Sequence, residues 1–513
     1  MKKWFYRLLS VALALLFIVA IYLYWRLHDR HPDYKVSLDI KGDQHGSLSV
    51  GFAAHKITPE VIDKWTDLNQ NYQYDDTDSF IDKNNNGKFD PVWMAGFQNQ
   101  RPAKLVLDDL WARAIVVDDG KTRIALVVTD LIGLGADDII DIKKSIPAEW
   151  GITYIIVTST HTHSGPDVVG LWGKKEYTSG VNKDYLEFVK SEVKESIHAA
   201  LQNIRPARVK FARDLTGAKN LVTDLREPVA FDYALHVMQV TDATTDSTLG
   251  TLVSWANHPE TLEDKNLSIS SDFPHFVRES MEHGVRKGDT VLHPGLGGVC
   301  LYVNGAIGGM MTTWSEFPIK DPFKGDEYKP ASYEKAKAQG QQLALLALKA
   351  LDSGKVIVNP SSIKLRAKTF EIPLDNKLYR LGAIAGIFTR GLSGWWKIRT
   401  EIAVWRLGPA TFLHEPGELY PEIAAGGVEA PAGQDFDIKP LEVPPLREVM
   451  PGEFKFIIGL SNDFIGYIIP QSQWDEKAPF TYNQTEAPYG EVNSVGPRTA
   501  PIIYNELREL LNK

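Results

Sequence analysis

Short apolar runs recur along most of the chain and alternate with segments of helical periodicity. The runs of strand length cover residues 113–117, 123–128, 153–157, 234–240, 248–256, 402–407 and 454–460. Residues 184–203 place apolar side chains on one helical face with Asp184 as the expected N-cap, and a second helix is expected from Ser332 to Leu351. Strands interleaved with helices predict a mixed α/β fold, with β-sheet layers flanked by helices. We expect one domain over residues 49–513.

Near the N-terminus the apolar pattern is continuous instead of periodic. Three cations in the first seven residues precede the run Leu8–Trp25, which is just long enough to span a bilayer as a helix. Tyr22 and Tyr24 near its end are typical of an aromatic belt at a membrane surface and unlike the small-residue cleavage site of a signal peptide. We expect residues 1–26 to be a membrane anchor, with a cleaved signal segment as the alternative, and residues 27–48 to be a polar tether. Both interpretations place the domain on the extracytoplasmic side, periplasmic or outer.

Composition narrows the classes of function. The 513 residues are 43% hydrophobic and 24% charged with a formal net charge of -9, so the chain is globular and lacks the overall basic charge typical of nucleic-acid binding. No protein partner is indicated. The single cysteine, Cys300, excludes an intramolecular disulfide and a four-cysteine zinc site. Any metal must therefore be held by His, Asp, Glu or Tyr side chains.

Histidines and a carboxylate follow several of the strand-like runs. His161 and His163 lie in the segment TSTHTHSGPD (158–167), directly after a strand, and would point the same way if that strand continued. His258 follows the run that ends at residue 256, and Glu418 and Tyr467 come after two further runs. Two histidines and one carboxylate are a familiar zinc set. From the His-Thr-His motif alone, a metal site and a pair of hydrogen-bonded histidines are equally good interpretations, and spacing does not single out Glu418 or Tyr467.

Six ordered motifs make the sequence resemble the neutral ceramidase family. They are GFAAHKITP (51–59), MAGF (94–97), TSTHTHSGP (158–166), NHP (257–259), PGE (416–418) and GLSNDFIGY (459–467). The resemblance covers Gly51 to Pro497 and implies a zinc-dependent amidohydrolase of sphingolipids. It also implies that His161, His258, Glu418 and Tyr467 bind the zinc, and that His163 polarises the substrate carbonyl or moves a proton.

The sequence departs from this family on the substrate side. Where the family has Asn-x-Gly-Asp-x-Ser-Pro, this chain has residues 304–312 (NGAIGGMMT), so Met311 stands in place of the essential serine and Gly309 in place of the aspartate. The family's Asn-Arg-Ser motif is reduced to Asn220, and Arg226 is the nearest cation that could hold a polar group of the substrate. The family also carries an extra C-terminal β-domain, whereas this sequence ends after a helical tail from Pro501. These departures put ceramide itself in question, although the metal set is intact.

The expected function is therefore zinc-dependent hydrolysis of an amide or ester bond in a lipid or N-acyl substrate. Two alternatives stay open: a catalytically inactive metal-binding surface protein, and a metallohydrolase of another class such as a phosphoesterase. Residues 379–399 combine tryptophans, other apolar residues and cations, which suits either a bilayer interface or a core segment with a basic edge. At an interface, this segment could be the substrate's entry path.

A second metal signal lies in the expected insertion 65–93. Asp82, Asn84, Asn86 and Asp90 follow the first half of an EF-hand loop, D-x-N-x-N-G-x-x-D, in which a glycine at position 6 permits the sharp turn. The glutamate expected at position 12 is missing, so we expect calcium to be bound outside an EF-hand helix pair, with Asp76 or Asp78 completing the shell. The alternative is an Asn/Asp/Gly-rich surface turn.

Overall fold

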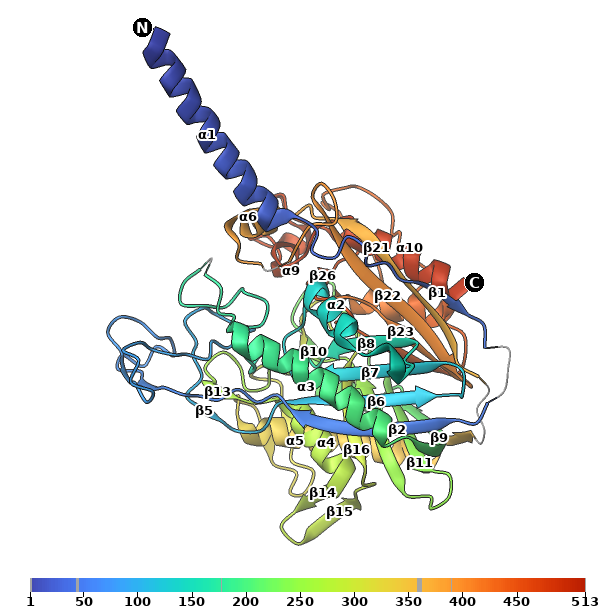
Figure 1. Cartoon of the computed structure of the whole chain (residues 1–513). Coiled ribbons are helices and arrows are strands. Elements are labelled where there is room, and N and C mark those ends of the chain that lie inside the picture. The colour runs from blue at the N-terminus through green and yellow to red at the C-terminus, as the bar shows by residue number, and fades with distance from the viewer. Residues whose placement is uncertain (1, 43–45, 177, 358–361, 389, 513) are drawn as a thin grey trace.

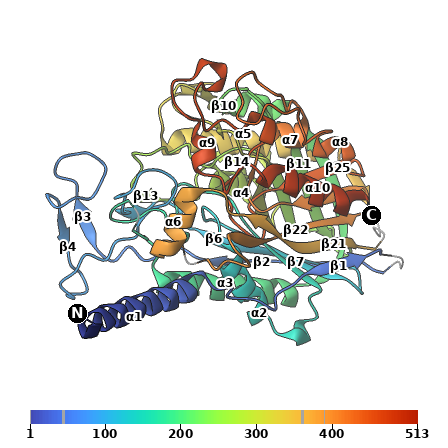
Figure 2. The same cartoon turned by 90° about the horizontal axis from the view of Figure 1, so that it is seen from above.

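The computed structural model describes the chain except residues 1, 43–45, 177, 358–361, 389 and 513. Its first element, α1 (Lys2–Leu27), projects from the body beside α6 (Lys377–Ala385) (Figures 1 and 2). By length and composition this helix can cross a membrane, a property that a membrane anchor and a signal sequence share, and none of its apolar residues is buried against the body.

The larger of two main sheets bends back on itself. In order across the sheet, its strands are β16 (Val299–Asn304), β12 (Thr248–Trp255), β11 (Leu235–Asp242), β9 (Arg205–Asp214), β2 (Ser49–Lys56), β6 (Trp111–Asp118), β7 (Arg123–Thr129) and β8 (Tyr154–Ser159), with β20 (Lys355–Ile357) paired to β9. β2 and β9 pair only through Ser49–Pro206 and Val50–Arg205, and β16 returns to contact β6, β7 and β8. The carboxyl ends of β8, β12 and β16 therefore lie close together.

A smaller sheet packs on the concave side of the first. It contains β1 (Ser37–Ile40), β21 (Lys364–Pro373), β22 (Lys397–Leu407), β23 (Ala410–His414) and β25 (Phe454–Ile458). The Trp405 and Phe412 rings stack with centroids 3.8 Å apart, and Phe412 stacks on Phe456 at 4.5 Å. These rings join Phe211 of the larger sheet in one buried cluster between the two sheets. Buried aromatic side chains contribute large apolar areas, so this core holds the two sheets in a fixed relation.

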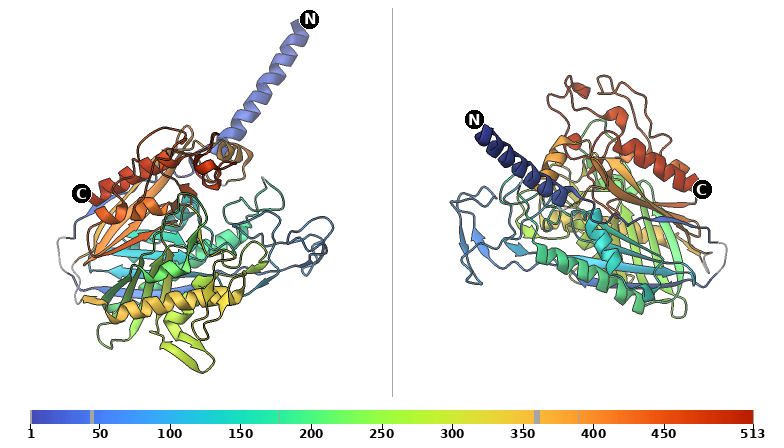
Figure 3. Two further views of the ribbon diagram at one scale, coloured as in Figure 1. Left: turned by 180° about the vertical axis from the view of Figure 1, so that it is seen from behind. Right: turned by 45° about the horizontal axis from the view of Figure 1, so that its top comes forward.

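Helices cover the outer faces of both sheets, which confirms the expected α/β layers (Figures 1 and 3). α2 (Ala136–Ser145) and α3 (Lys183–Gln202) lie on the β2–β6–β7 side, α4 (Phe273–His283) and α5 (Tyr333–Asp352) on the β9–β11–β16 side, and α7 (Pro421–Ala425), α8 (Leu446–Val449) and α10 (Thr499–Asn512) on the smaller sheet. Ser332 caps α5 as expected. The N-cap expected at Asp184 is wrong: the Asn182 side chain accepts the backbone N–H groups of Asp184 and Tyr185, and α3 begins at Lys183.

Shorter elements complete the described chain. The strands are β3 (Lys64–Thr66), β4 (Ser79–Ile81), β5 (Leu105–Val106), β10 (Thr223–Asp224), β13 (Ser268–Ile269), β14 (Gly284–Lys287), β15 (Thr290–Pro294), β17 (Met311–Thr312), β18 (Ile319–Lys320), β19 (Glu327–Tyr328), β24 (Glu418–Leu419) and β26 (Tyr467–Ile468). α9 (Tyr489–Val492) and the 3-10 turns Ala148–Trp150, Gly217–Leu221, Gln471–Gln473 and Thr481–Asn483 lie in connecting loops. β3 and β4 form the hairpin of the 65–93 insertion, at the left of Figure 2.

Candidate metal centre and active site

The His-Thr-His segment leaves its strand before the first histidine. β8 ends at Ser159, and His161 has a backbone φ of +70°, in the left-handed region that L-residues rarely adopt. The expectation that the two histidines point the same way along a continuing strand is therefore wrong. The turn nevertheless brings the His161 and His163 rings to 4.9 Å between centroids. The Nδ1 atom of His161 lies 2.6 Å from the carbonyl oxygen of Ile132, which fixes the ring orientation.

His258 is held in the same way at the end of β12. Its Nδ1 lies 2.9 Å from the carbonyl oxygen of Met311, which also accepts the His258 backbone N–H. Asn304, the last residue of β16, connects the two histidine loops. Its side-chain amide donates to the carbonyl oxygens of Thr160 and Asn257, at 2.9 Å each, and its side-chain oxygen accepts the Asn257 N–H. Sequence reasoning missed these hydrogen bonds because no spacing rule relates Asn304 to the histidines.

The register of two short strands brings the remaining pair together. β23 and β25 are parallel neighbours in the smaller sheet, and the chain leaving each of them forms β24 and β26. These also pair in parallel, with Glu418 directly opposite Tyr467. The backbone N–H of Glu418 donates to the carbonyl oxygen of Gly466 at 2.9 Å. The four expected ligands thus follow four different strands, two from each sheet.

These side chains converge in a buried space. The Glu418 Oε2 atom lies 3.2 Å from Nε2 of His258 and 3.6 Å from Nε2 of His161. The ligand atoms of His161, His163 and His258 all lie within 4.8 Å of one another. A hydrogen bond from Nδ1 to a backbone carbonyl leaves Nε2 with its lone pair, and this arrangement orients histidine ligands around metals. The geometry therefore fits a site that holds one cation.

Burial and charge set the protonation of the cluster. Burial lowers the pKa of His161 to about 4. Burial alone would also lower the pKa of His258, but its hydrogen bond to Glu418 and the charge of Glu260 raise it to about 9. Burial opposes ionisation of Glu418, yet the two histidines hold its pKa below the usual range. The ionised carboxylate and the neutral imidazole of His161 are donors that zinc prefers, and His258 would release its proton when a cation binds.

His163 lies beside the cluster without a hydrogen-bond partner on either ring nitrogen among the described residues. Its Nδ1 is 3.3 Å from the Oε2 atom of Glu260, and burial lowers its pKa well below the usual value, so the ring is neutral. The backbone carbonyl of His163 accepts a 2.5 Å hydrogen bond from the buried guanidinium of Arg101. A Cβ on Gly96 would come within 2.4 Å of the ring. Sequence reasoning missed Glu260, although it follows His258 by two residues, and nothing in the pattern indicated Arg101.

Arg226 lies in a pocket that shares Tyr467 with the space around this histidine. Its guanidinium donates two hydrogen bonds to the Glu422 carboxylate, at 2.8 and 2.7 Å, and lies over the Tyr420 ring. Together with Met310 and Tyr467, Arg226 lines a polar pocket that adjoins the centre. Gly309 permits this placement, because a Cβ there would come within 2.0 Å of the arginine Nε. Arg226 therefore faces the site but already has a carboxylate partner.

The residues around the missing family serine support the backbone. The Met311 side chain is fully buried, and its carbonyl oxygen holds His258. The Thr313 hydroxyl accepts hydrogen bonds from Asn257 and Gln339 and donates to the Leu221 carbonyl oxygen. The Thr313 hydroxyl therefore has a structural role, in the hydrogen bonds between the end of β12 and α5.

The expected calcium loop is an ordered turn held by hydrogen bonds among its own side chains and backbone. Asp82 accepts the backbone N–H groups of Asn86 and Gly87, and Asp90 accepts the side-chain amides of Asn84 and Asn86, at 2.6 and 2.8 Å. The carboxylate of Asp63 accepts the N–H groups at both ends of the loop.

A second loop, residues 67–75, repeats this hydrogen-bond pattern. Asp67 accepts the N–H groups of Asn71 and Tyr72, and Asp75 accepts the amides of Asn69 and Asn71. Its spacing, D-x-N-x-N-x-x-x-D, is the signal that sequence reasoning overlooked. Asp78 accepts the backbone N–H groups of Leu68 and Asp75 in this second loop, and Asp76 lies beside Lys174, so neither completes the first loop as expected.

Comparison with known proteins finds one family match and two similar folds. Residues 86–295 match the family model described as neutral/alkaline non-lysosomal ceramidase, N-terminal. The structure is similar to the crystal structure of neutral ceramidase from Pseudomonas aeruginosa, with a TM-score of 0.64 at 15% identity over 91% of this chain and 74% of that one. It is also similar to a structure described as ceramidase complexed with C2, with a TM-score of 0.62 at 14% identity over 91% and 75% of the two chains. As the ordered motifs indicated, part of the chain matches the neutral/alkaline ceramidase family model, and the fold is similar to that of the two ceramidase structures.

Proposed function

We propose that this protein is a zinc-dependent hydrolase of an amide or ester bond in a lipid or N-acyl substrate. The observation that carries the proposal is the convergence of His161, His258, Glu418 and Tyr467 beside the buried, neutral ring of His163. His161, His258, Glu418 and Tyr467 would hold the zinc. Tyr467 lies opposite Glu418 on the paired strand and would also donate a hydrogen bond to its carboxylate. Bound there, zinc would polarise a carbonyl and lower the pKa of a water molecule.

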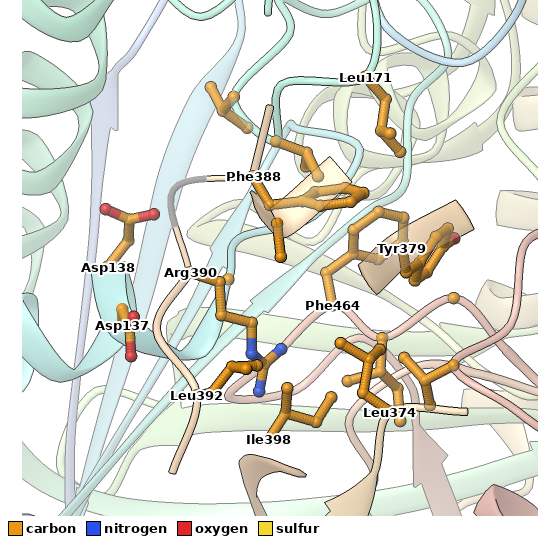
Figure 4. Close-up of a pocket in the computed structure, with 17 residues that line it drawn as sticks. Asp137, Asp138, Leu171, Leu374, Tyr379, Phe388, Arg390, Leu392, Ile398 and Phe464 are labelled. Carbon is orange, nitrogen blue, oxygen red and sulfur yellow. The ribbon is translucent and has the colours of Figure 1, made fainter. Parts of the chain in front are cut away.

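An amphiphilic substrate suits the spaces on either side of this centre. One is an apolar cavity lined by Leu374, Phe388, Leu392 and Ile398 (Figure 4). Leu171, Tyr379, Phe464 and Gly466 line both this cavity and the space at the centre. On the other side lies the polar pocket that contains Arg226. A substrate with its tail in the apolar cavity and its polar group beside Arg226 would present the bond between them to the centre.

The chain's own groups can supply the proton chemistry. A neutral imidazole carries one N–H donor and one acceptor nitrogen. His163 can therefore donate a hydrogen bond to an oxyanion that develops on the substrate, or a proton to the leaving group. Glu260 would orient the ring through Nδ1, and Arg101 would hold the backbone of the same residue.

Metal content and turnover test the proposal. The purified protein should hold about one zinc per chain and hydrolyse N-acyl or ester reporters in a chelator-sensitive manner. His161→Ala with His258→Ala should abolish both properties, whereas His283→Ala, on an exposed histidine, should change neither. Full zinc occupancy in the double variant would contradict the ligand set.

The same reporters separate the alternatives. Chelator-sensitive turnover of phosphoesters alone would indicate a phosphoesterase, and zinc binding without turnover would indicate an inactive metal-binding protein. The described cations near the centre argue against a phosphate site, because Arg226 is paired with Glu422 and Arg101 is turned toward backbone carbonyls.

We also propose that α1 anchors the chain in a membrane, with the body on the extracytoplasmic side. The support is its apolar length together with the aromatic residues at its end. Protein from membranes should start upstream of residue 26 and should need detergent for extraction. A mature N-terminus at or beyond residue 26 would identify a cleaved signal segment.

A further inference from the structure

The segment that covers the apolar cavity has one face toward the cavity and another toward solvent. We call residues 377–388 and 390–396 the roof segment; it consists of α6 and part of the loop that follows. Tyr379 and Ala383 of α6, then Phe388 and Leu392, line the cavity (Figure 4). Leu378 and Leu381 lie on the opposite face of α6, 50% and 61% exposed, and Trp395 is 88% exposed. The roof segment thus has apolar side chains on both faces, but only one face packs against the body of the protein.

The last turn of α1 is attached to this segment. The Tyr22 hydroxyl donates to the carbonyl oxygen of Ile384 at 3.0 Å, and the N–H of Leu392 donates to the carbonyl oxygen of Leu27 at 3.1 Å. Just after α1, Asp29 forms a bidentate ion pair with Arg399. These contacts fix the position of the roof segment along the axis of α1, next to the last turn of that helix.

That position lies at the surface of the bilayer. The 26 residues of α1 span about 39 Å at 1.5 Å per residue, more than the ~30 Å hydrocarbon core of a membrane. Tyr22 and Trp25 at the end of α1 belong at the headgroup level, where aromatic side chains collect. Because Tyr22 bonds directly to Ile384, the end of α6 lies at that level as well.

We propose that the exposed face of the roof segment docks into the outer leaflet of the bilayer that α1 crosses. Leu378, Leu381 and Trp395 enter the headgroup and upper acyl region, as the apolar face of an interfacial helix does. Arg380 and Lys397 pair with Asp375 and Glu371, so the docking rests on the apolar side chains. The apolar cavity then lies directly beneath the membrane surface, separated from it by the roof segment alone.

This arrangement deepens the proposed function, on which its catalytic consequence rests. The cavity is narrow, with about 80 Å³ of space open to the centres of water-sized groups. Movement of the roof segment toward the bilayer would admit a lipid tail. The left-handed Gly386 at the end of α6 provides a point at which the segment can bend. A substrate tail would pass from the leaflet into the cavity without crossing water.

Site-specific fluorescence on the full chain tests the docking. Cys300 is the only cysteine and is buried, so Leu381→Cys and Trp395→Cys can each be labelled with an environment-sensitive fluorophore. Val291→Cys, on the exposed β14–β15 hairpin at the opposite end of the body, is the matched control (Figure 1). In phosphatidylcholine nanodiscs, labels at 381 and 395 should be quenched by doxyl-labelled lipid and protected from iodide, and the label at 291 should show the reverse. Equal iodide access at all three positions would overturn the docking.

A hydrolysis experiment separates docking from chemistry. Leu381→Ser with Trp395→Ser should lower turnover of a long-chain N-acyl lipid in vesicles by about tenfold, since two apolar side chains leave the leaflet. Turnover of a water-soluble short-chain analogue should stay unchanged. An equal loss on both substrates would overturn the membrane role of these residues. Lipid quenching at 381 and 395 without hydrolysis of either substrate would support the docking and contradict the proposed function.

Discussion

Arg226→Met is expected to destabilise the fold by an amount that grows with pH. The arginine forms two hydrogen bonds to Glu422, whose side chain is fully buried, and Gln473 donates a third at 2.9 Å. Burial raises the pKa of Glu422, and the charge of Arg226 opposes that rise. Without the arginine, the carboxylate keeps one amide donor and no cation. It will then take up a proton instead of remaining charged in the interior.

The free-energy cost of protonating Glu422 sets an upper limit on the loss of stability. An unfolded glutamate titrates near 4.3, so keeping it neutral at pH 7 costs about 3.7 kcal/mol at ~1.36 kcal/mol per pH unit. At pH 5 the same cost is about 1 kcal/mol. The folded state binds more protons than the unfolded state in this range, so the stability of the variant falls as the pH rises from 5 to 7.

Urea unfolding of the full chain in detergent, at pH 5 and pH 7, measures the difference. Arg226→Met should lose up to about 2.7 kcal/mol more at pH 7 than at pH 5, relative to the parent protein. Arg226→Met with Glu422→Gln should recover most of that loss, because the remaining amide needs no cation. A destabilisation independent of pH would refute the reasoning. If the double variant is stable but has a raised KM, Arg226 also contacts the substrate, as the sequence suggested.

Two further substitutions test other parts of the molecule. Gly96→Ala should lower kcat about a hundredfold while leaving zinc bound, because the added Cβ displaces the His163 ring. Gly297→Ala is the control, since Gly297 also has a positive φ but lies in open space. Equal losses of kcat in both variants would mean that backbone strain alone is responsible. Calcium should raise the thermal midpoint of the parent protein but not of Asp82→Ala; equal increases in both would place the ion elsewhere.

Hydrophobic periodicity predicted the fold class because each sheet has one face in a core. The run 153–157 and the helix 184–203 appear as β8 and α3 with ends shifted by one or two residues. What periodicity could not supply is the relation between the sheets. The return of β16 against β6, β7 and β8 depends on a bend at β2 and β9, and no local pattern in the sequence encodes that bend.

Prediction from sequence is limited in the same way for the single residues of the candidate centre. Ordered motifs allowed His161, His258, Glu418 and Tyr467 to be named together, although their spacing in the chain is irregular. The residues that position them carry no such signal. Asn304 acts through its amide on two backbone carbonyls, and partners of this kind are set by tertiary packing.

The departure at Met311 concerns the substrate side of the site more than the metal side. The group that supports His258 is the backbone carbonyl of Met311, which any residue would provide. The preceding residues, Gly309 and Met310, both have positive φ, and the turn they form admits the Arg226 side chain beside the polar pocket. An aspartate at 309, as in the family pattern, would put a Cβ within 2.0 Å of that arginine. The loop and the Arg226–Glu422 pair are therefore one structural unit. A change in this unit alters the shape and charge offered to a substrate while leaving the four candidate ligands on their strands.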